Sequence, residues 1–582
     1  MMIGLTPFRK ISLVLVLVLI VAGSAYAQQY NQTDSLKKHI YYLASDELAG
    51  RKPGTPGIEK AAAYIANQFK NIGVKPFAGS YLQPFKILVG AMLDENNTLS
   101  LNDNVLKLGS DFIPSDMSGS GKATGQVVFI GYGLDKHYGK SYEGIDVKGK
   151  WVIAIRGSMD PSDKSERALL IGDYAKAMSA FEKGAIGVLF VNPPWMNNEK
   201  LGIKDSYNRS MGNVNIPVIR ISSKIALKII NKPADYIDTF PVDNEPASFN
   251  TDAVVSGETS FKLLYQNTNN VVGYLEGSDP KLKDEYIVVG GHYDHLGMGG
   301  GGSRRPDTIA IHSGADDNAS GTAGVIELAR RIKAGNSSFG RSFIFVTFSA
   351  EEMGLLGSEY FVAKPIVPLT SIKGMINLDM IGRLNEVLTL EGTGSTVESD
   401  SILTILEKGR PFKVTRSAGA SGGSDHATFY NKGVPVFFFF TGIHSDYHTP
   451  ADKADKINYK GESDVLDMAF DLAKMMGTSK PFTFQQITNH INVGARNYRV
   501  TLGLMPDVSG GLNDGVKVID RRKGGPAEKA GIKKNDNIIS IGGKEVKNIT
   551  EYMYRLNLLK KGEKTEIGII RNGEKLIIIV QL

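Results

Sequence analysis

Four apolar runs separated by helical segments constrain the fold of this chain most. The runs lie at residues 286–289, 343–348, 375–378 and 434–440. Between them are longer segments, such as residues 319–333, whose apolar residues recur at helical spacing. Continuous apolar runs are typical of strands buried on both faces of a sheet, and strand–helix alternation is typical of a parallel one. Residues 269–476 therefore predict an α/β domain with a mostly parallel central sheet flanked by helices.

Metal-binding residue types follow each of these runs. His292, the pair Glu351 and Glu352, and Asp379 each come directly after a run, and His448 lies in the loop after the last one. Because ligands bind at the carboxyl ends of strands in open α/β sheets, we expect these side chains to meet at one edge. Six of the nine histidines lie between His292 and His448, and imidazole and carboxylate are zinc ligands. The pattern predicts a metal site.

The residue types also suggest how such a site would act. The chain has no cysteine, so His, Asp and Glu must supply any ligands. One carboxylate can bridge two neighbouring cations that together activate a water molecule, and a glutamate that binds no metal can take the proton of that water. The adjacent Glu351 and Glu352 offer one acid for each task.

Five strings in this region carry a family resemblance: GHYDHLG at 291–297, GADDNASG at 314–321, SAEEMG at 349–354, NLD at 377–379 and YHTPAD at 447–452. With LAGR at 48–51 and GTPG at 54–57, the chain resembles the zinc exopeptidases that include bacterial leucyl-type aminopeptidases and glutamate carboxypeptidase. The resemblance covers roughly residues 35–115 and 250–478. It implies a zinc exopeptidase-like fold and peptide substrates.

The resemblance implies two zinc ions per chain and a ligand set. The first ion would be held by His292 and Asp379 and the second by Glu352 and His448. Asp317 would bridge both ions, and its peptide bond to Asn318 would be cis.

The same resemblance implies three further roles. Glu351 would be the general base, Asp294 would orient His292, and Tyr447 would steady the oxyanion. All ligand positions of the family pattern are filled, which argues against an inactive relative.

At some positions the sequence does not decide which residue would bind metal. Asp316 is adjacent to Asp317 and could be the bridge instead, although alignment on the string DNASG favours Asp317. Four more histidines lie near the motifs and are expected not to bind metal: His295, His312, His426 and His444.

The amino-terminal residues predict a signal peptide. Arg9 and Lys10 precede an apolar run at residues 11–21 that is too short to span a membrane, and Ala25-Tyr26-Ala27 fits a cleavage site. We therefore expect an exported protein, periplasmic or secreted, with no stable membrane span after the signal is removed.

The rest of the chain divides into segments by composition. The expected domains are residues 1–27 (signal peptide), 28–117 and 247–480 (the two parts of the peptidase domain), 118–246 (a β-rich insert), 481–497 (a linker) and 498–582 (a small β-rich unit). The net charge of +6 is small for 582 residues, and no basic stripe with interleaved aromatic residues is present, so nucleic-acid binding is not expected.

Two segments resemble known accessory domains. DVKGKWVIAIR at 146–156 and AFEKGAIGVLF at 180–190 resemble a protease-associated domain. LGL at 502–504, GPAEKAG at 525–531 and DNIISIGG at 536–543 resemble a PDZ domain, whose groove could hold the carboxyl terminus of a peptide or protein. The insert could gate the active site or only stabilise the fold.

Aminopeptidase activity is the favoured function, since acids such as Glu351 and Asp379 would surround a free amino group. A carboxypeptidase or dipeptidase would instead need a basic pocket, for which Arg304, Arg305 and Arg383 are candidates. The same scaffold could also support glutaminyl cyclase chemistry or serve as a non-catalytic binding protein.

Overall fold

The structure is a computed structural model. It describes residues 31–134, 140–157, 166–193, 201–204, 206–208, 212–233, 236, 247–300, 302–305, 308–335, 338–420, 422–478, 480–487, 500–506, 515–522 and 524–582. The predicted signal peptide lies outside these residues, as does most of the predicted linker. Within the described ranges, no helix combines the length and hydropathy needed to cross a bilayer.

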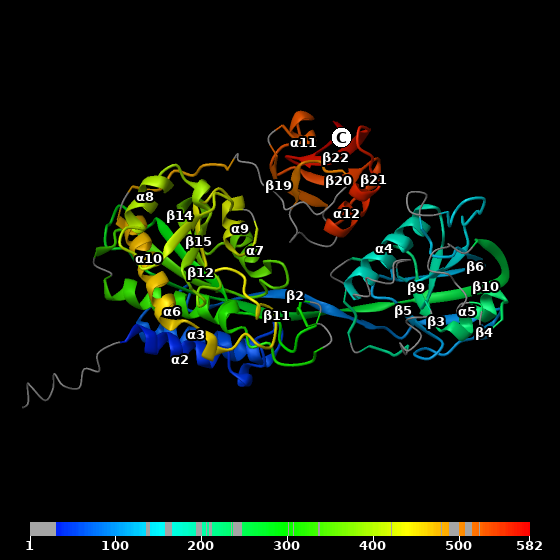
Figure 1. Ribbon diagram of the computed structural model, residues 1–582, viewed down its shortest axis with the longest axis horizontal. Helices are drawn as coiled ribbons and strands as arrows, with labels where there is room; N and C mark the ends of the chain where they lie inside the picture. The colour runs from blue at the N-terminus through cyan, green and yellow to red at the C-terminus, as the bar shows by residue number, and fades with distance from the viewer. Residues whose placement is uncertain are drawn as a thin grey trace, which may run out of the picture.

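The predicted peptidase domain is built on a nine-stranded mixed sheet with the strand order β1-β11-β13-β12-β14-β17-β15-β16, and with β2 paired to β11 (Figure 1). The central strands β13, β12, β14 and β17 pair with one another in parallel, as the apolar runs predict. Pairings of β11 with β13 and of β15 with β17 are antiparallel, so the sheet is mixed towards its edges. The bounds are β1 Lys75–Pro76, β2 Leu82–Leu93, β11 Phe261–Leu275, β12 Tyr286–His292, β13 Ser342–Phe348, β14 Ile372–Leu378, β15 Val387–Glu391, β16 Lys413–Arg416 and β17 Val436–Phe440.

Both faces of this sheet are covered by helices. Because side chains alternate along a strand, Ile287 and Val289 enter one core and Val288 enters the other. The first core is closed by α2 Gln32–Leu43, α3 Pro56–Ile72, α6 Gly321–Ala334 and α10 Tyr459–Thr478, and the second by α7 Leu356–Ala363 and α9 His426–Asn431. The helix–loop–helix at the amino terminus is therefore part of the peptidase core.

The insert forms its own sheet with the order β4-β3-β10-β6-β7-β8-β9-β5. Four strands form its parallel centre: β6 Gly121–Phe129, β7 Trp151–Ile155, β8 Gly187–Val191 and β9 Val218–Ile221. Helix α4 (Glu166–Glu182) contacts β8. The sheet also includes strands outside the expected range 118–246: β3 Thr98–Leu101, β4 Asn104–Val105, β5 Phe112–Pro114 and β10 Phe249–Thr259.

A two-stranded ribbon joins the two domains. β2 and β11 pair antiparallel from Leu82 with Val271 to Leu93 with Phe261. β11 follows β10 directly, so one stretch of chain belongs first to the insert sheet and then to the peptidase sheet (Figure 1).

Within its described residues, the carboxyl-terminal unit is a sheet of six strands with two short helices, α11 Pro526–Lys529 and α12 Ile549–Asn557. Its strands are β18 Leu504–Pro506, β19 Val516–Arg521, β20 Asn537–Ile541, β21 Lys544–Glu545, β22 Lys564–Arg571 and β23 Glu574–Gln581. One face of α12 packs on the insert: Tyr554 is buried in the insert's core, and Arg555 forms an ion pair with Glu182 of α4. The unit also reaches the peptidase domain, where Lys534 Nζ lies 4.7 Å from the ring centre of Tyr430.

Candidate metal centre

The ends of the central strands deliver the predicted ligands. β12 ends on His292, Glu351 and Glu352 follow β13, and Asp379 follows β14. His448 lies in the loop after β17, and Asp317 lies in the turn that leads into α6. The structure brings together all five predicted ligands.

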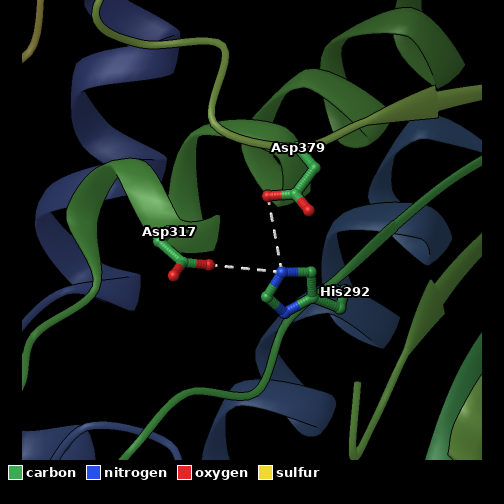
Figure 2. Close-up of side chains that lie close together, drawn as sticks. All are labelled: His292, Asp317 and Asp379. Atoms are coloured by element: carbon green, nitrogen blue, oxygen red, sulfur yellow. Dashed lines mark ion pairs between the residues drawn. The ribbon is translucent and has the colours of Figure 1, made fainter. Parts of the chain in front are cut away.

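The first group of possible metal ligands is His292, Asp317 and Asp379. Nε2 of His292 lies 3.3 Å from Asp317 Oδ1 and 3.5 Å from Asp379 Oδ1 (Figure 2). All three side chains are buried. Nitrogen and oxygen atoms at these separations face a common centre, as ligands around one cation do.

The second group shares Asp317 with the first. The Oδ2 atom of Asp317 lies 3.1 Å from Nε2 of His448 and 3.7 Å from Nδ1 of His295. Glu352 completes the group, with Oε2 3.2 Å from His448 Nε2 and Oε1 2.7 Å from His295 Nδ1. The two carboxylate oxygens of Asp317 therefore face different groups, which is the arrangement of a bridging ligand.

The ring orientations of His292 and His448 suit metal binding. Nδ1 of His292 is 3.2 Å from the carbonyl oxygen of Asp294, and Nδ1 of His448 is 2.9 Å from that of Gly302. A proton on each Nδ1 can be donated to these carbonyls, leaving an Nε2 lone pair directed at the acids. Metal-bound histidines usually have such a backbone partner.

Two observations test whether a cation fits here. Asp379 Oδ1 is buried without a hydrogen-bond partner among the described residues, although carboxylate oxygens are costly to bury unpaired. Burial raises the pKa of Asp379, and the nearby carboxylate of Asp317 raises it further, while His292 opposes both. A cation would relieve this crowding, so the residues fit a metal.

Asp294 orders the segment that follows β13. Its Oδ1 and Oδ2 accept hydrogen bonds from the backbone N–H groups of Glu351 and Glu352, at 3.1 and 3.3 Å. The carboxylate also lies 3.7 Å from His292 Nδ1. The Asp294 carboxylate thus contacts the backbone of Glu351 and Glu352, and it lies near the imidazole ring of His292.

Glu351 stands next to the first group without belonging to either. Its Oε2 is 3.9 Å from His292 Nε2. Burial raises the pKa of Glu351 well above its usual range; His292 acts in the opposite direction, and the carboxylates of Glu352 and Asp425 add to the rise. A carboxylate with a raised pKa is suited to take up a proton near neutral pH.

Tyr447 lies beside the second group. Its ring stacks on His448 with 3.8 Å between ring centres. Burial raises the pKa of its hydroxyl, and the carboxylates of Asp317 and Glu352 raise it further, so the group stays protonated and able to donate.

The backbone around the site has unusual conformations. The Asp317–Asn318 peptide bond is cis, as the family resemblance implies. Ala350, Met380 and His448 have left-handed φ angles of 60°, 51° and 55°. Left-handed conformations cost energy in residues with side chains and cluster at functional sites.

Two residues that hold the site together have no role predicted from the sequence. Oδ2 of buried Asp452 accepts hydrogen bonds from the N–H groups of Asp316 and Asp317, at 2.9 and 3.1 Å. Buried Arg51 donates to the carbonyl oxygens of Leu43, Tyr293, Ser313 and Gly314. Both occur in the family strings, but their long-range backbone partners leave no local pattern in the sequence.

The structure places the residues whose assignments the sequence leaves open. Asp316 faces His444, Ser320 and the N–H of Gly382 rather than the second carboxylate group. His312 pairs with Ser303, and His426 stacks on Phe438. His295, expected not to bind metal, contacts Glu352 and lies with Glu352 and Asp317 in a group that could hold a metal ion.

Comparisons with known proteins match three parts of the chain to known domain families. Residues 270–473 match peptidase family M28, residues 123–229 match the PA domain and residues 495–582 match the PDZ domain. Aminopeptidase YwaD of Bacillus subtilis is 26% identical over 439 residues, covering 72% of this chain and 80% of the relative. A glutamate carboxypeptidase 2 homolog of Caenorhabditis elegans is 22% identical over 528 residues, covering 72% and 64%. The solved zinc aminopeptidase BSAP from Bacillus subtilis is 22% identical, with a TM-score of 0.45 over 78% of this chain and 95% of that one.

An α/β domain of this family with imidazole and carboxylate groups gathered at its strand ends defines a metalloexopeptidase. The chain contains a domain that matches peptidase family M28, with a PA domain inserted into it and a PDZ domain following it.

Proposed function

We propose that this protein is an exported aminopeptidase that uses two zinc ions to release residues from the amino termini of peptides. His292 and Asp379 would hold the first ion, Glu352 and His448 the second, and Asp317 both. The observation that carries the proposal is that the two carboxylate oxygens of Asp317 face different histidines. Oδ1 is 3.3 Å from His292 and Oδ2 is 3.1 Å from His448.

The remaining residues supply proton transfer and orientation. When bound, the ions supply Lewis-acid chemistry, polarising the scissile carbonyl and making water more acidic. Glu351 takes the proton of the attacking water and passes it to the leaving amine. Asp294 holds the backbone of Glu351 and Glu352 in place. The Tyr447 hydroxyl donates a hydrogen bond to the developing oxyanion.

The charges around the site favour a substrate amino group over a substrate carboxylate. Glu351 and Asp379 lie on the side of the first group, where an ammonium group would be attracted. Of the candidate arginines, Arg383 is held by Asp446 and Asp452 at 3.2 and 3.5 Å, which neutralises its charge. Arg304 and Arg305 are exposed, so a carboxypeptidase activity would depend on them.

A panel of peptides tests the activity. Peptides with free and with blocked amino termini would be incubated with the full chain, with and without chelator, and products identified by mass spectrometry. We expect cleavage of free-amino peptides alone, abolished by chelator and restored by zinc. Removal of residues from the carboxyl ends of blocked peptides would establish a carboxypeptidase instead.

The base is tested by Glu351→Gln, with Glu386→Gln, an exposed acid, as the control. We expect kcat to fall about 10²–10⁴-fold in the first variant while both zinc ions remain bound. Full activity in Glu351→Gln would remove this residue from the mechanism.

Export and the PDZ partner are separate parts of the proposal. Export rests on the signal sequence, and the expected mature amino terminus near Gln28 can be read by mass spectrometry of protein from the periplasm or medium. The PDZ domain would bind the carboxyl terminus of a substrate or partner, which a library of carboxyl-terminal peptides would identify.

A further inference from the structure

His295 is a fourth side chain at the second group of ligands. It is buried, with 1% of its surface exposed, and its ring centre is 5.7 Å from that of His448. Nδ1 approaches Glu352 Oε1 to 2.7 Å, a hydrogen-bond distance, but stays 3.7 Å from Asp317 Oδ2.

The orientation of this ring differs from that of the two predicted histidine ligands. His292 and His448 turn Nδ1 to a backbone carbonyl and Nε2 to the acids. His295 turns Nδ1 to a carboxylate, and its buried Nε2 has no hydrogen-bond partner within the described residues. The proton of a neutral His295 therefore belongs on Nδ1, where it can be donated to Glu352.

The two oxygens of Glu352 are divided between two histidines. Oε1 is occupied by His295, while Oε2 lies 3.2 Å from Nε2 of His448. We propose that His295 is a positioning residue: its Nδ1–H fixes the Glu352 carboxylate so that only Oε2 is presented to the second metal ion. This inference rests on the two-ion site proposed above.

The fold confines the His295 ring. Its backbone N–H donates to the carbonyl oxygen of Arg51 at 3.3 Å, and the Arg51 guanidinium holds the carbonyl of Gly314 at 2.9 Å. A Cβ at Gly314, which has a φ of +54°, would come within 2.6 Å of the ring. Gly314 therefore leaves the space that the ring fills, and the hydrogen bond to Arg51 fixes the backbone from which the ring extends.

The experiment measures metal binding rather than activity. The full chain would be stripped of metal and compared with His295→Leu, which removes the donor, and with His295→Asn, which places an N–H near the Nδ1 position. His39→Leu removes another buried histidine of this domain, one that contacts Tyr64 and belongs to neither group of possible ligands, and serves as the control. Zinc affinities come from chelator competition, ion counts from elemental analysis and the ligand field from the visible spectrum with Co²⁺.

The expected result is selective. His295→Leu should weaken one of the two zinc-binding steps about 10–100-fold and leave the other unchanged, because loss of a partner that orients a ligand has about this effect. His295→Asn should recover most of the affinity and show the wild-type Co²⁺ spectrum at saturation, and His39→Leu should bind both ions normally.

Three results would overturn the proposal. Unchanged affinities in His295→Leu would show that the hydrogen bond does not orient Glu352. Equal loss in both His295 variants, with an altered Co²⁺ spectrum, would make His295 a direct ligand. Wild-type protein that binds fewer than two ions would refute the two-ion site itself, before any variant is compared.

Discussion

Glu462 offers a direct test of how this core tolerates charge. It lies on α10 with no exposed surface, and neither carboxylate oxygen has a hydrogen-bond partner among the described residues. Burial raises the pKa of Glu462 well above its ordinary value of 4.5, and the carboxylates of Asp316 and Glu327 raise it further. The side chain should therefore be protonated in the folded protein at pH values where the unfolded chain has released its proton.

The effect on stability follows from proton linkage. Below about pH 4 both states are protonated, so wild type and Glu462→Gln should unfold alike. Above that pH the unfolded state loses its proton first, and the free energy of unfolding of the wild type should decrease by up to about 1.4 kcal/mol per pH unit until the folded pKa is reached. Glutamine has no proton to lose, so the variant should be the more stable protein at pH 7.

Calorimetry of the peptidase-domain transition at pH 4, 5.5 and 7 measures this difference at a fixed zinc concentration. For a domain of this size, 1 kcal/mol corresponds to a midpoint shift of about 2–4 °C. Asp467→Asn on the same helix is the control, since that half-exposed acid pairs with Arg331. A gap between wild type and Glu462→Gln that is independent of pH, or a wild type more stable at pH 7, would refute the reasoning.

Three further predictions concern the site and the domain contacts. Tyr447→Phe should lower kcat about 10²–10³-fold with unchanged zinc content, and a wild-type rate would remove its hydroxyl from oxyanion stabilisation. Adding zinc to stripped protein at about 100 times Kd should stabilise the peptidase domain by roughly 2.7 kcal/mol for each ion bound, measured by calorimetry; no shift would mean that the clustered acids do not bind it. Arg555→Glu should release the PDZ domain from the PA domain because it faces Glu182, giving a more expanded particle by X-ray scattering that Glu182→Arg restores in the double variant. Scattering identical to wild type in Arg555→Glu would show that this pair does not hold the domains.

The central strands and the positions of the candidate ligands could be predicted because both depend on local sequence. A strand buried on both faces must be apolar along its whole length, and parallel strands end at the same edge. The positions of His292, Glu352 and Asp379 directly after such runs therefore carry spatial information.

The boundaries of the insert could not be predicted in the same way. β10 and β11 form one nearly continuous extended segment interrupted only at Ser260, and nothing in its composition marks the change from one sheet to the other. The strands β3, β4 and β5 are short, and β3 and β5 pair with partners distant in sequence, so their sheet is decided by tertiary contacts. The antiparallel pairing of β15 with β17 has the same origin.

The role of His295 could not be predicted from its residue type. It lies three positions from His292 in the same string, and both are buried histidines surrounded by acids. What distinguishes them is the direction of each ring, which depends on carbonyl groups and on the empty space at Gly314, contributed by other segments of the chain. Because a histidine binds a metal through one nitrogen and its surroundings through the other, its role is decided by which nitrogen those surroundings occupy. At His292 they occupy Nδ1 and leave Nε2 for the ion, whereas at His295 Glu352 occupies Nδ1, which makes the second histidine a support for a ligand.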